Sequence, residues 1–188
     1  MCLGDSITIG SRSAIGYPEY CADELSSVTN KYWNVVNHAV AGYKTIDLCR
    51  SVSNNFAHLS QFKPEIISIM VGTNDLKSRT SLHDFKISYQ QLLIKARLLV
   101  GNSNVLLILI PPLMEGVMLP YKVDMNQLAQ DYNEVISHFA EEMGFSLFSF
   151  EAKNEHFYDG VHLNNEGSKE WGKQLAGEIL QGRYSKKD

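Results

Sequence analysis

The most constraining feature of this sequence is a series of short apolar runs separated by segments with helical periodicity. The runs at residues 65–71 and 104–110 are rich in β-branched and aliphatic side chains, and they end at a glycine and a proline pair. Between them, residues 81–100 repeat apolar side chains at helical spacing. Strands that are apolar on both faces and alternate with helices are typical of a parallel sheet covered on both sides.

The remaining segments extend the same alternation along the chain. The pattern predicts a three-layer α/β/α sandwich with about five parallel strands, formed by one domain over residues 1–188. The first strand is short, since a strand usually has about five residues. We therefore expect either residues before Met1 in the native chain or an abbreviated sheet at this edge. Further strands are predicted at residues 1–3, 33–36 and 145–150, and helices at residues 18–27, 45–59, 81–100, 123–143 and 164–180.

Composition excludes several classes of function. The chain has 188 residues and a formal net charge of −4, and its nearest approach to a basic run is the segment 185–187. Nucleic-acid binding needs clustered Lys and Arg, so no nucleic-acid partner is predicted. No apolar run approaches the ~20 residues of a membrane span, and no signal peptide is recognisable in the chain. We therefore expect a cytoplasmic protein with a small-molecule partner; the pattern does not indicate an oligomeric state.

Cysteine and histidine spacing gives no sign of a metal site. The three cysteines, Cys2, Cys21 and Cys49, match no metal-binding motif and cannot form a closed set of disulfides. No nucleotide-binding glycine motif follows the first strand. The sequence therefore predicts neither a metal nor an organic cofactor.

Four segments with small or polar residues follow predicted strands. Because the carboxyl ends of parallel strands meet at one edge of a sheet, we expect these segments to lie together there. They are Gly4-Asp5-Ser6, residues 37–42, Gly72-Thr73-Asn74-Asp75 and Asp159-Gly160-Val161-His162.

These segments contain the groups that serine hydrolysis requires. Ser6 supplies a hydroxyl, His162 a base, and Asp159, three residues earlier, a carboxylate that can hold the imidazole. The Gly42 and Ser6 backbone N–H groups and the Asn74 amide can stabilise an oxyanion. Each segment alone is weak evidence, since such residues usually form an ordinary turn, a loop or a helix start. Their joint presence and order favour a catalytic interpretation.

At this point the sequence resembles the SGNH hydrolases, also called GDSL esterases and lipases. Their four blocks are matched by Gly4-Asp5-Ser6-Ile7, Gly42, Gly72-Thr73-Asn74-Asp75 and Asp159-Gly160-Val161-His162-Leu163. The resemblance implies a flavodoxin-like fold. It also implies Ser6 as nucleophile, His162 as base with Asp159 as its partner, and an oxyanion hole formed by Ser6, Gly42 and Asn74.

Substrate contacts are less clearly indicated. The segment 111–121 is unusually apolar for a loop, and two interpretations stay open: a substrate wall that includes Met114 and Met118, or a loop packed on the core or in a dimer. Tyr158, next to Asp159, is a further candidate for substrate contact.

The favoured function is a serine acyl-hydrolase that cleaves small or short-acyl carboxylic esters or thioesters through an acyl-enzyme on Ser6. A carbohydrate O-acetylesterase or an acyltransferase that uses the same site is the alternative. A binding module that has lost activity is a third hypothesis, which the intact catalytic residue types disfavour.

Overall fold

The computed structural model of the chain describes residues 1–100 and 104–184. The basic run at 185–187 lies outside the described residues. Five parallel strands form one sheet in the order β2-β1-β3-β4-β5, the order of flavodoxin-like folds. The strands are β1 (Cys2–Gly4), β2 (Asn37–Ala39), β3 (Ile67–Met70), β4 (Val105–Ile108) and β5 (Ser146–Phe148).

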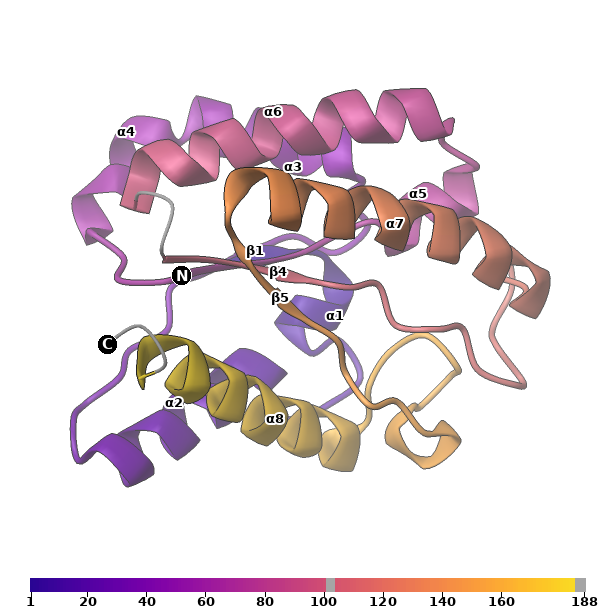
Figure 1. Cartoon of the computed structure of the whole chain (residues 1–188). Coiled ribbons are helices and arrows are strands. Elements are labelled where there is room, and N and C mark those ends of the chain that lie inside the picture. Colours follow the sequence, from indigo (N-terminus) through magenta and orange to yellow (C-terminus); the bar gives the residue numbers. More distant parts are fainter. Residues whose placement is uncertain (101–103, 185–188) are drawn as a thin grey trace.

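Helices cover both faces of the sheet (Figure 1). Helices α2 and α8 pack together on one face, and α3, α6 and α7 lie on the other. This arrangement confirms the predicted three-layer α/β/α sandwich. The α-helices are α1 (Ser6–Ile9), α2 (Tyr17–Thr29), α3 (Thr45–Asn54), α4 (Phe56–Leu59), α5 (Thr73–Ser78), α6 (Leu82–Val100), α7 (Asn126–Met143) and α8 (Asn165–Tyr184), and short 3-10 turns are η1 (Ser60–Phe62), η3 (Val123–Met125) and η4 (Asn154–His156).

The predicted strand at residues 33–36 is wrong, because the strand that pairs with β1 is Asn37–Ala39. The apolar content of residues 33–36 suggested a strand there, but Trp33 packs against the C-terminal end of α2. Its backbone N–H and its ring N–H donate to Ser26 Oγ and Thr29 Oγ1 at 3.0 and 3.1 Å. Trp33 thus packs against α2, and backbone hydrogen bonding to β1 begins at Val36, whose carbonyl oxygen accepts from the Cys2 N–H at 2.8 Å.

The predicted helices are confirmed with changes at their ends. The segment 45–59 forms two helices, α3 and α4, which are separated at Asn55. The segment 123–143 begins as a 3-10 turn before α7. Ser81 caps α6, since its hydroxyl oxygen accepts a 3.1 Å hydrogen bond from the Asp84 N–H.

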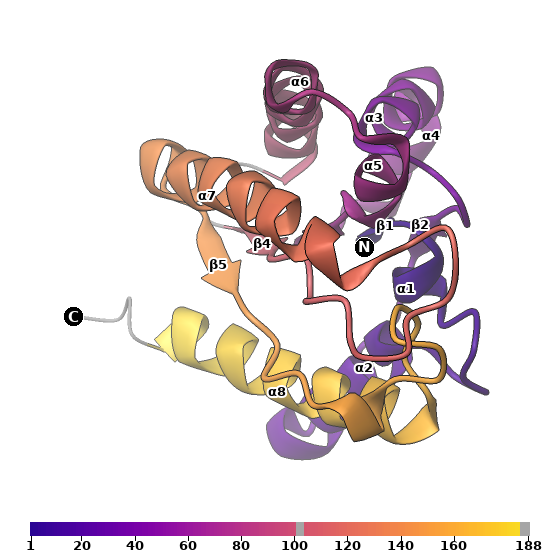
Figure 2. The ribbon, with the colours of Figure 1, turned by 90° about the vertical axis from the view of Figure 1, so that its right-hand side faces the viewer.

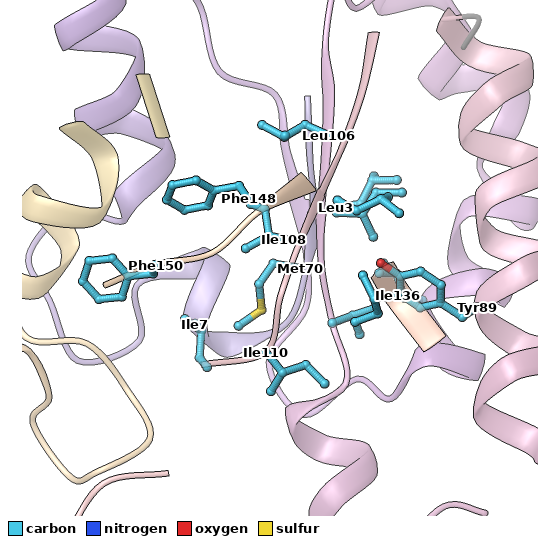
Figure 3. Packing of buried hydrophobic residues seen from close by; sticks show 14 of the residues in the cluster. Leu3, Ile7, Met70, Tyr89, Leu106, Ile108, Ile110, Ile136, Phe148 and Phe150 are labelled. Carbon is cyan, nitrogen blue, oxygen red and sulfur yellow. The ribbon is translucent and has the colours of Figure 1, made fainter. Parts of the chain in front are cut away.

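The core lies on both faces of the sheet. Figure 3 shows Leu3, Tyr89 and Ile136 on the side of α6 and α7, and Phe148 and Phe150 on the side of α8. Each of these side chains is buried. Burial on two faces explains why the strands are apolar at successive positions rather than at alternate ones.

The described residues contain no helix that is long and apolar enough to cross a membrane. In the same part of the chain, no three His, Cys, Asp or Glu side chains are grouped so that they could hold a metal ion.

The contact between α2 and α8 depends on a buried aromatic stack and a glycine. Trp171 of α8 stacks on Tyr17 and Phe150, with ring centroids 4.8 and 4.6 Å apart. At the next residue, Gly172, a Cβ would lie 2.5 Å from the Tyr20 Cβ and 2.8 Å from the Tyr17 carbonyl oxygen. Gly172 therefore sets how closely the two helices approach.

We expect Gly172→Ala to lower the free energy of unfolding by about 1–3 kcal/mol, because the added methyl group has no space. Gly177→Ala in the same helix is the matched control, since its Cβ would meet nothing within 4 Å. That control should gain up to about 1 kcal/mol from the higher helix propensity of alanine. Urea unfolding of the two variants measures both changes, and a Gly172→Ala protein as stable as the wild type would contradict the packing argument.

Candidate active site

The segment that follows β1 presents Ser6 at the start of α1. Gly4 leaves no room for a larger side chain, since a Cβ there would lie 2.7 Å from the Met70 carbonyl oxygen. Asp5 Oδ1 accepts a 3.0 Å hydrogen bond from the Ile7 N–H and so caps α1. Ser6 is therefore the first helical residue, next to the carboxyl end of a central strand.

Two successive hydrogen bonds connect Ser6 to His162 and His162 to Asp159, which come from the C-terminal part of the chain. Ser6 Oγ lies 3.0 Å from His162 Nε2, and His162 Nδ1 lies 2.9 Å from Asp159 Oδ2. The side chains of His162 and Asp159 are only 16% and 12% exposed. An imidazole held between a hydroxyl and a carboxylate can take the hydroxyl proton. The structure thus brings together the three residues that the sequence analysis grouped.

The orientation of Asp159 is determined by its own loop. Its Oδ1 accepts hydrogen bonds from the backbone N–H groups of His162 and Val161 at 2.8 and 3.1 Å, which leaves Oδ2 directed at the imidazole. Burial alone would raise the pKa of Asp159, but the hydrogen bonds from His162 and Val161 outweigh it and hold the pKa below its usual value. An ionised Asp159 favours the imidazole tautomer that has its proton on Nδ1.

The segments that carry Gly42 and Asn74 flank Ser6. In the sheet, Gly4 pairs with Ala39 of β2 on one side and with Met70 of β3 on the other. Gly42 follows β2 with a φ of 83°, a left-handed conformation that glycine adopts without strain. Asn74 follows β3 in the first turn of α5, and its side chain is buried.

Side-chain hydrogen bonds connect these two flanking segments. Asn74 Nδ2 donates to the Tyr43 carbonyl oxygen at 3.0 Å. Asp75 Oδ2 accepts from the Thr45 N–H and hydroxyl at 2.8 and 3.0 Å. Since Tyr43 and Thr45 come directly after the Gly42 turn, α5 holds that turn in place.

The candidate substrate residues lie beside the Asp159 loop. The Met114 and Met118 backbone N–H groups donate to the carbonyl oxygens of Gly160 and Asp159 at 2.9 and 3.0 Å. Tyr158 is exposed over 67% of its surface. Segment 111–121 also buries Leu113 in the core, so packing on the core describes part of this segment.

Two further residues near the site were missed by sequence reasoning. Arg12 Nε lies 3.7 Å from Asp159 Oδ2, and its guanidinium lies over the Tyr158 ring at 5.6 Å from the centroid. The Tyr121 hydroxyl donates a 3.1 Å hydrogen bond to Asn74 Oδ1. Neither residue belongs to a motif, and each reaches the site through a loop, so no sequence pattern could have found them.

Comparison with known proteins agrees with this geometry. A family model described as the GDSL-like lipase/acylhydrolase family matches residues 2–169. The chain belongs to this family. The predicted family is thereby confirmed, and with it the class of enzyme: the protein is a hydrolase of the esterase or lipase type. No relative was found among curated protein sequences.

Several solved structures have a fold similar to that of this GDSL-like hydrolase. Axe2, an acetylxylan esterase from Geobacillus stearothermophilus, is 20% identical with a TM-score of 0.68, and the alignment covers 96% of this chain and 91% of that one. The psychrotrophic esterase EstA from Pseudoalteromonas sp. is 15% identical with a TM-score of 0.73 and coverages of 96% and 95%. A putative G-D-S-L lipolytic protein from Desulfitobacterium hafniense is 18% identical with a TM-score of 0.71 and coverages of 94% and 97%. At these identities the likeness shows a shared fold.

A second carboxyl group, that of Asp5, lies next to Ser6 in the turn between β1 and α1 of this GDSL-like hydrolase. Asp5 is fully buried, and its Oδ2 has no hydrogen-bond partner within the described residues. Burial raises the pKa of Asp5 to about 7 despite the Ile7 N–H, and the nearby Asp75 carboxyl adds to the rise. The folded protein therefore binds this proton more tightly than the unfolded chain does.

Ionisation of Asp5 should destabilise the fold as pH rises from 3.8, its ordinary pKa, to about 7. We expect Asp5→Asn, which keeps the capping oxygen, to gain stability relative to the wild type by up to about 1.4 kcal/mol per pH unit across this range. Urea unfolding at a series of pH values measures the difference. Asp23→Asn, at an exposed position of α2, controls for the charge change, and a pH-independent difference for Asp5→Asn would refute the argument.

Proposed function

We propose that this protein is a serine acyl-hydrolase that cleaves small or short-acyl carboxylic esters or thioesters through an acyl-enzyme on Ser6. The proposal rests on two hydrogen bonds: Ser6 Oγ lies 3.0 Å from His162 Nε2, and His162 Nδ1 lies 2.9 Å from Asp159 Oδ2. Membership of the GDSL-like lipase/acylhydrolase family supports it.

In the proposed reaction His162 acts first as base and then as acid. Ser6 Oγ attacks the substrate carbonyl carbon while His162 Nε2 takes the hydroxyl proton. His162 passes that proton to the leaving alcohol or thiol as its bond to the acyl carbon breaks. A water molecule then attacks the acyl-enzyme, gives a proton to His162, and releases the acid and Ser6 when that proton returns to Oγ. Asp159 stabilises the imidazolium in both halves.

The negative charge on the carbonyl oxygen needs donors beside Ser6. The Ser6 N–H lies at the start of α1, where backbone N–H groups have no intrahelical acceptor. The Gly42 N–H and Asn74 Nδ2 come from the two segments that flank Ser6. Of the two Asn74 Nδ2 hydrogens, one is directed to the Tyr43 carbonyl oxygen and the other is available to the substrate.

The acyl or alcohol part of the substrate is proposed to contact Met114, Met118 and Tyr158. Met118 and Tyr158 are partly exposed beside the Asp159 loop, and Met114 packs partly on the core. A flexible thioether suits an adaptable acyl contact. A site formed by short loops rather than by an inserted domain favours small acyl groups.

A carbohydrate O-acetylesterase is the second candidate. It is motivated by the name of the similarly folded Axe2, which is an acetylxylan esterase. A panel of esters graded by acyl length, with acetylated sugars included, separates the two substrate classes. Product analysis with an added alcohol acceptor separates hydrolysis from acyl transfer.

Replacement of the nucleophile is the first test. We expect Ser6→Ala to abolish hydrolysis of a short p-nitrophenyl ester, because no other hydroxyl is hydrogen-bonded to His162 Nε2 within the described residues. Ser11→Ala, at a nearby exposed position, is the control and should keep activity. Turnover by Ser6→Ala at the wild-type rate would remove Ser6 as the nucleophile.

Replacement of the amide donor is the second test. We expect Asn74→Ala to lower kcat on the order of 10²-fold with a smaller change in KM, because the lost donor acts mainly on the transition state. Asn54→Ala, at an exposed position near the end of α3, is the control. Steady-state kinetics measures both constants, and a change limited to KM would contradict an oxyanion role.

Labelling with a fluorophosphonate probe separates an enzyme from an inactive binding module. We expect covalent labelling of the wild type at Ser6, detected by mass spectrometry of the intact and digested protein. Ser6→Ala should not label, and a wild-type protein that also fails to label would favour the binding module.

A further inference from the structure

Tyr121 connects the segment after β4 to the amide of Asn74. Its side chain is 6% exposed, and its hydroxyl donates a 3.1 Å hydrogen bond to Asn74 Oδ1. Asn74 is itself only 3% exposed. A hydrogen bond between two such buried groups is shielded from competition by water.

The orientation of the Asn74 amide follows from its two partners. The Tyr43 carbonyl oxygen can only accept, so the amide nitrogen faces it, at 3.0 Å. The Tyr121 hydroxyl then donates to the opposite atom, Oδ1. Because the amide group is planar, fixing Oδ1 and one N–H also fixes the direction of the second N–H. That second N–H is the one proposed above to reach the substrate carbonyl.

The backbone around Tyr121 is firmly anchored. At the start of its segment, Asn133 of α7 pairs with both backbone groups of Ile110 at 2.8 and 2.9 Å, and Asn126 pairs in the same way with Leu113 at 2.7 and 2.9 Å. These four hydrogen bonds fix the chain where it leaves the sheet.

Further along, the same segment is joined to the Asp159 loop. The Met118 N–H donates to the Asp159 carbonyl oxygen, and the Tyr121 N–H donates to the Met118 carbonyl oxygen, both at 3.0 Å. Figure 2 shows this segment, between β4 and α7, running past α1 at the carboxyl end of the sheet. The segment therefore has the rigidity that a positioning contact requires.

The Tyr121 hydroxyl also stays protonated. Burial raises the pKa of Tyr121, and the negative charges of Asp5 and Asp159 raise it further. The hydroxyl is consequently a donor at neutral pH, which matches the acceptor that Asn74 Oδ1 presents.

We propose that Tyr121 is a positioning residue of the oxyanion hole, whose hydroxyl holds the Asn74 amide with its second N–H directed at the substrate carbonyl oxygen. The inference rests on the proposed function. It assigns Tyr121 a role in preorganisation: the donor is oriented before the charge develops, so the effect falls on the transition state. A purely structural role predicts a loss of stability without a selective loss of kcat.

The test is a double-mutant cycle between positions 121 and 74. We expect Tyr121→Phe to lower kcat by about tenfold with little change in KM, as for one lost hydrogen bond that acts in the transition state. In the Asn74→Ala background, Tyr121→Phe should have almost no further effect on kcat, because the group it positions is gone. Tyr132→Phe is the matched control: it removes a hydroxyl that donates to the Thr80 carbonyl oxygen, away from Asn74 Oδ1, and should leave kcat unchanged.

A spectroscopic measurement tests the same contact without turnover. In ¹⁵N-labelled protein, the Asn74 side-chain NH₂ signals are assigned by their disappearance in Asn74→Ala. Tyr121→Phe should shift them and Tyr132→Phe should not. Unshifted signals in a folded Tyr121→Phe protein would overturn the proposal.

The kinetic outcomes also distinguish a failure of the role proposed for Tyr121 from a failure of the proposed acyl-hydrolase function. An unchanged kcat in Tyr121→Phe, or an equal loss in both backgrounds, overturns the role of Tyr121 while the Ser6 and Asn74 variants still uphold the acyl-enzyme mechanism. Full turnover by Ser6→Ala instead refutes the proposed function itself.

Discussion

The position of β1 between β2 and β3 is the constraint on which the site depends. Parallel pairing on both sides aligns Gly4 with Ala39 and Met70, so the three segments that follow these strands leave the sheet side by side. Ser6, with its own backbone N–H, lies in the middle segment, and the other two proposed oxyanion donors, Gly42 and Asn74, lie in the outer two. A parallel sheet needs long crossovers between neighbouring strands, which is why residues distant in sequence meet here.

Beyond the ends of the strands, hydrogen bonds of side chains connect the loops to one another. Asp75 bonds to Thr45, and Tyr121 bonds to Asn74, so each loop at this edge is connected to a neighbour. The Asp159 loop is joined to the segment after β4 by a backbone hydrogen bond, from the Met118 N–H to the Asp159 carbonyl oxygen. The Thr45–Asp75 and Tyr121–Asn74 hydrogen bonds are buried, so water competes little with them.

The sequence could predict the fold because its signals are local. Strands apolar on both faces and helices with a clear period are visible in short windows, and the polar segments that follow strands could be assigned to one sheet edge. The strand at residues 33–36 was misplaced because apolar content does not reveal which segment pairs with β1 and which packs on α2. Ser6, Asp159 and His162 were found because they lie in motifs. Tyr121 and Arg12 were not, because their contacts depend on the course of loops that no periodicity encodes.

The two asparagines of α7 have a consequence for which changes the segment after β4 of this chain can accept. Asn133 and Asn126 bond to the main chain of Ile110 and Leu113, not to their side chains. These hydrogen bonds therefore do not involve the side chains that the segment carries. Under the substrate contacts proposed above, the side chains of residues 114–118 can change while the backbone hydrogen bonds of Ile110 and Leu113 are retained. With the proposed roles of Met114, Met118 and Tyr121, one loop would then hold substrate contacts that can vary and a positioning contact that does not.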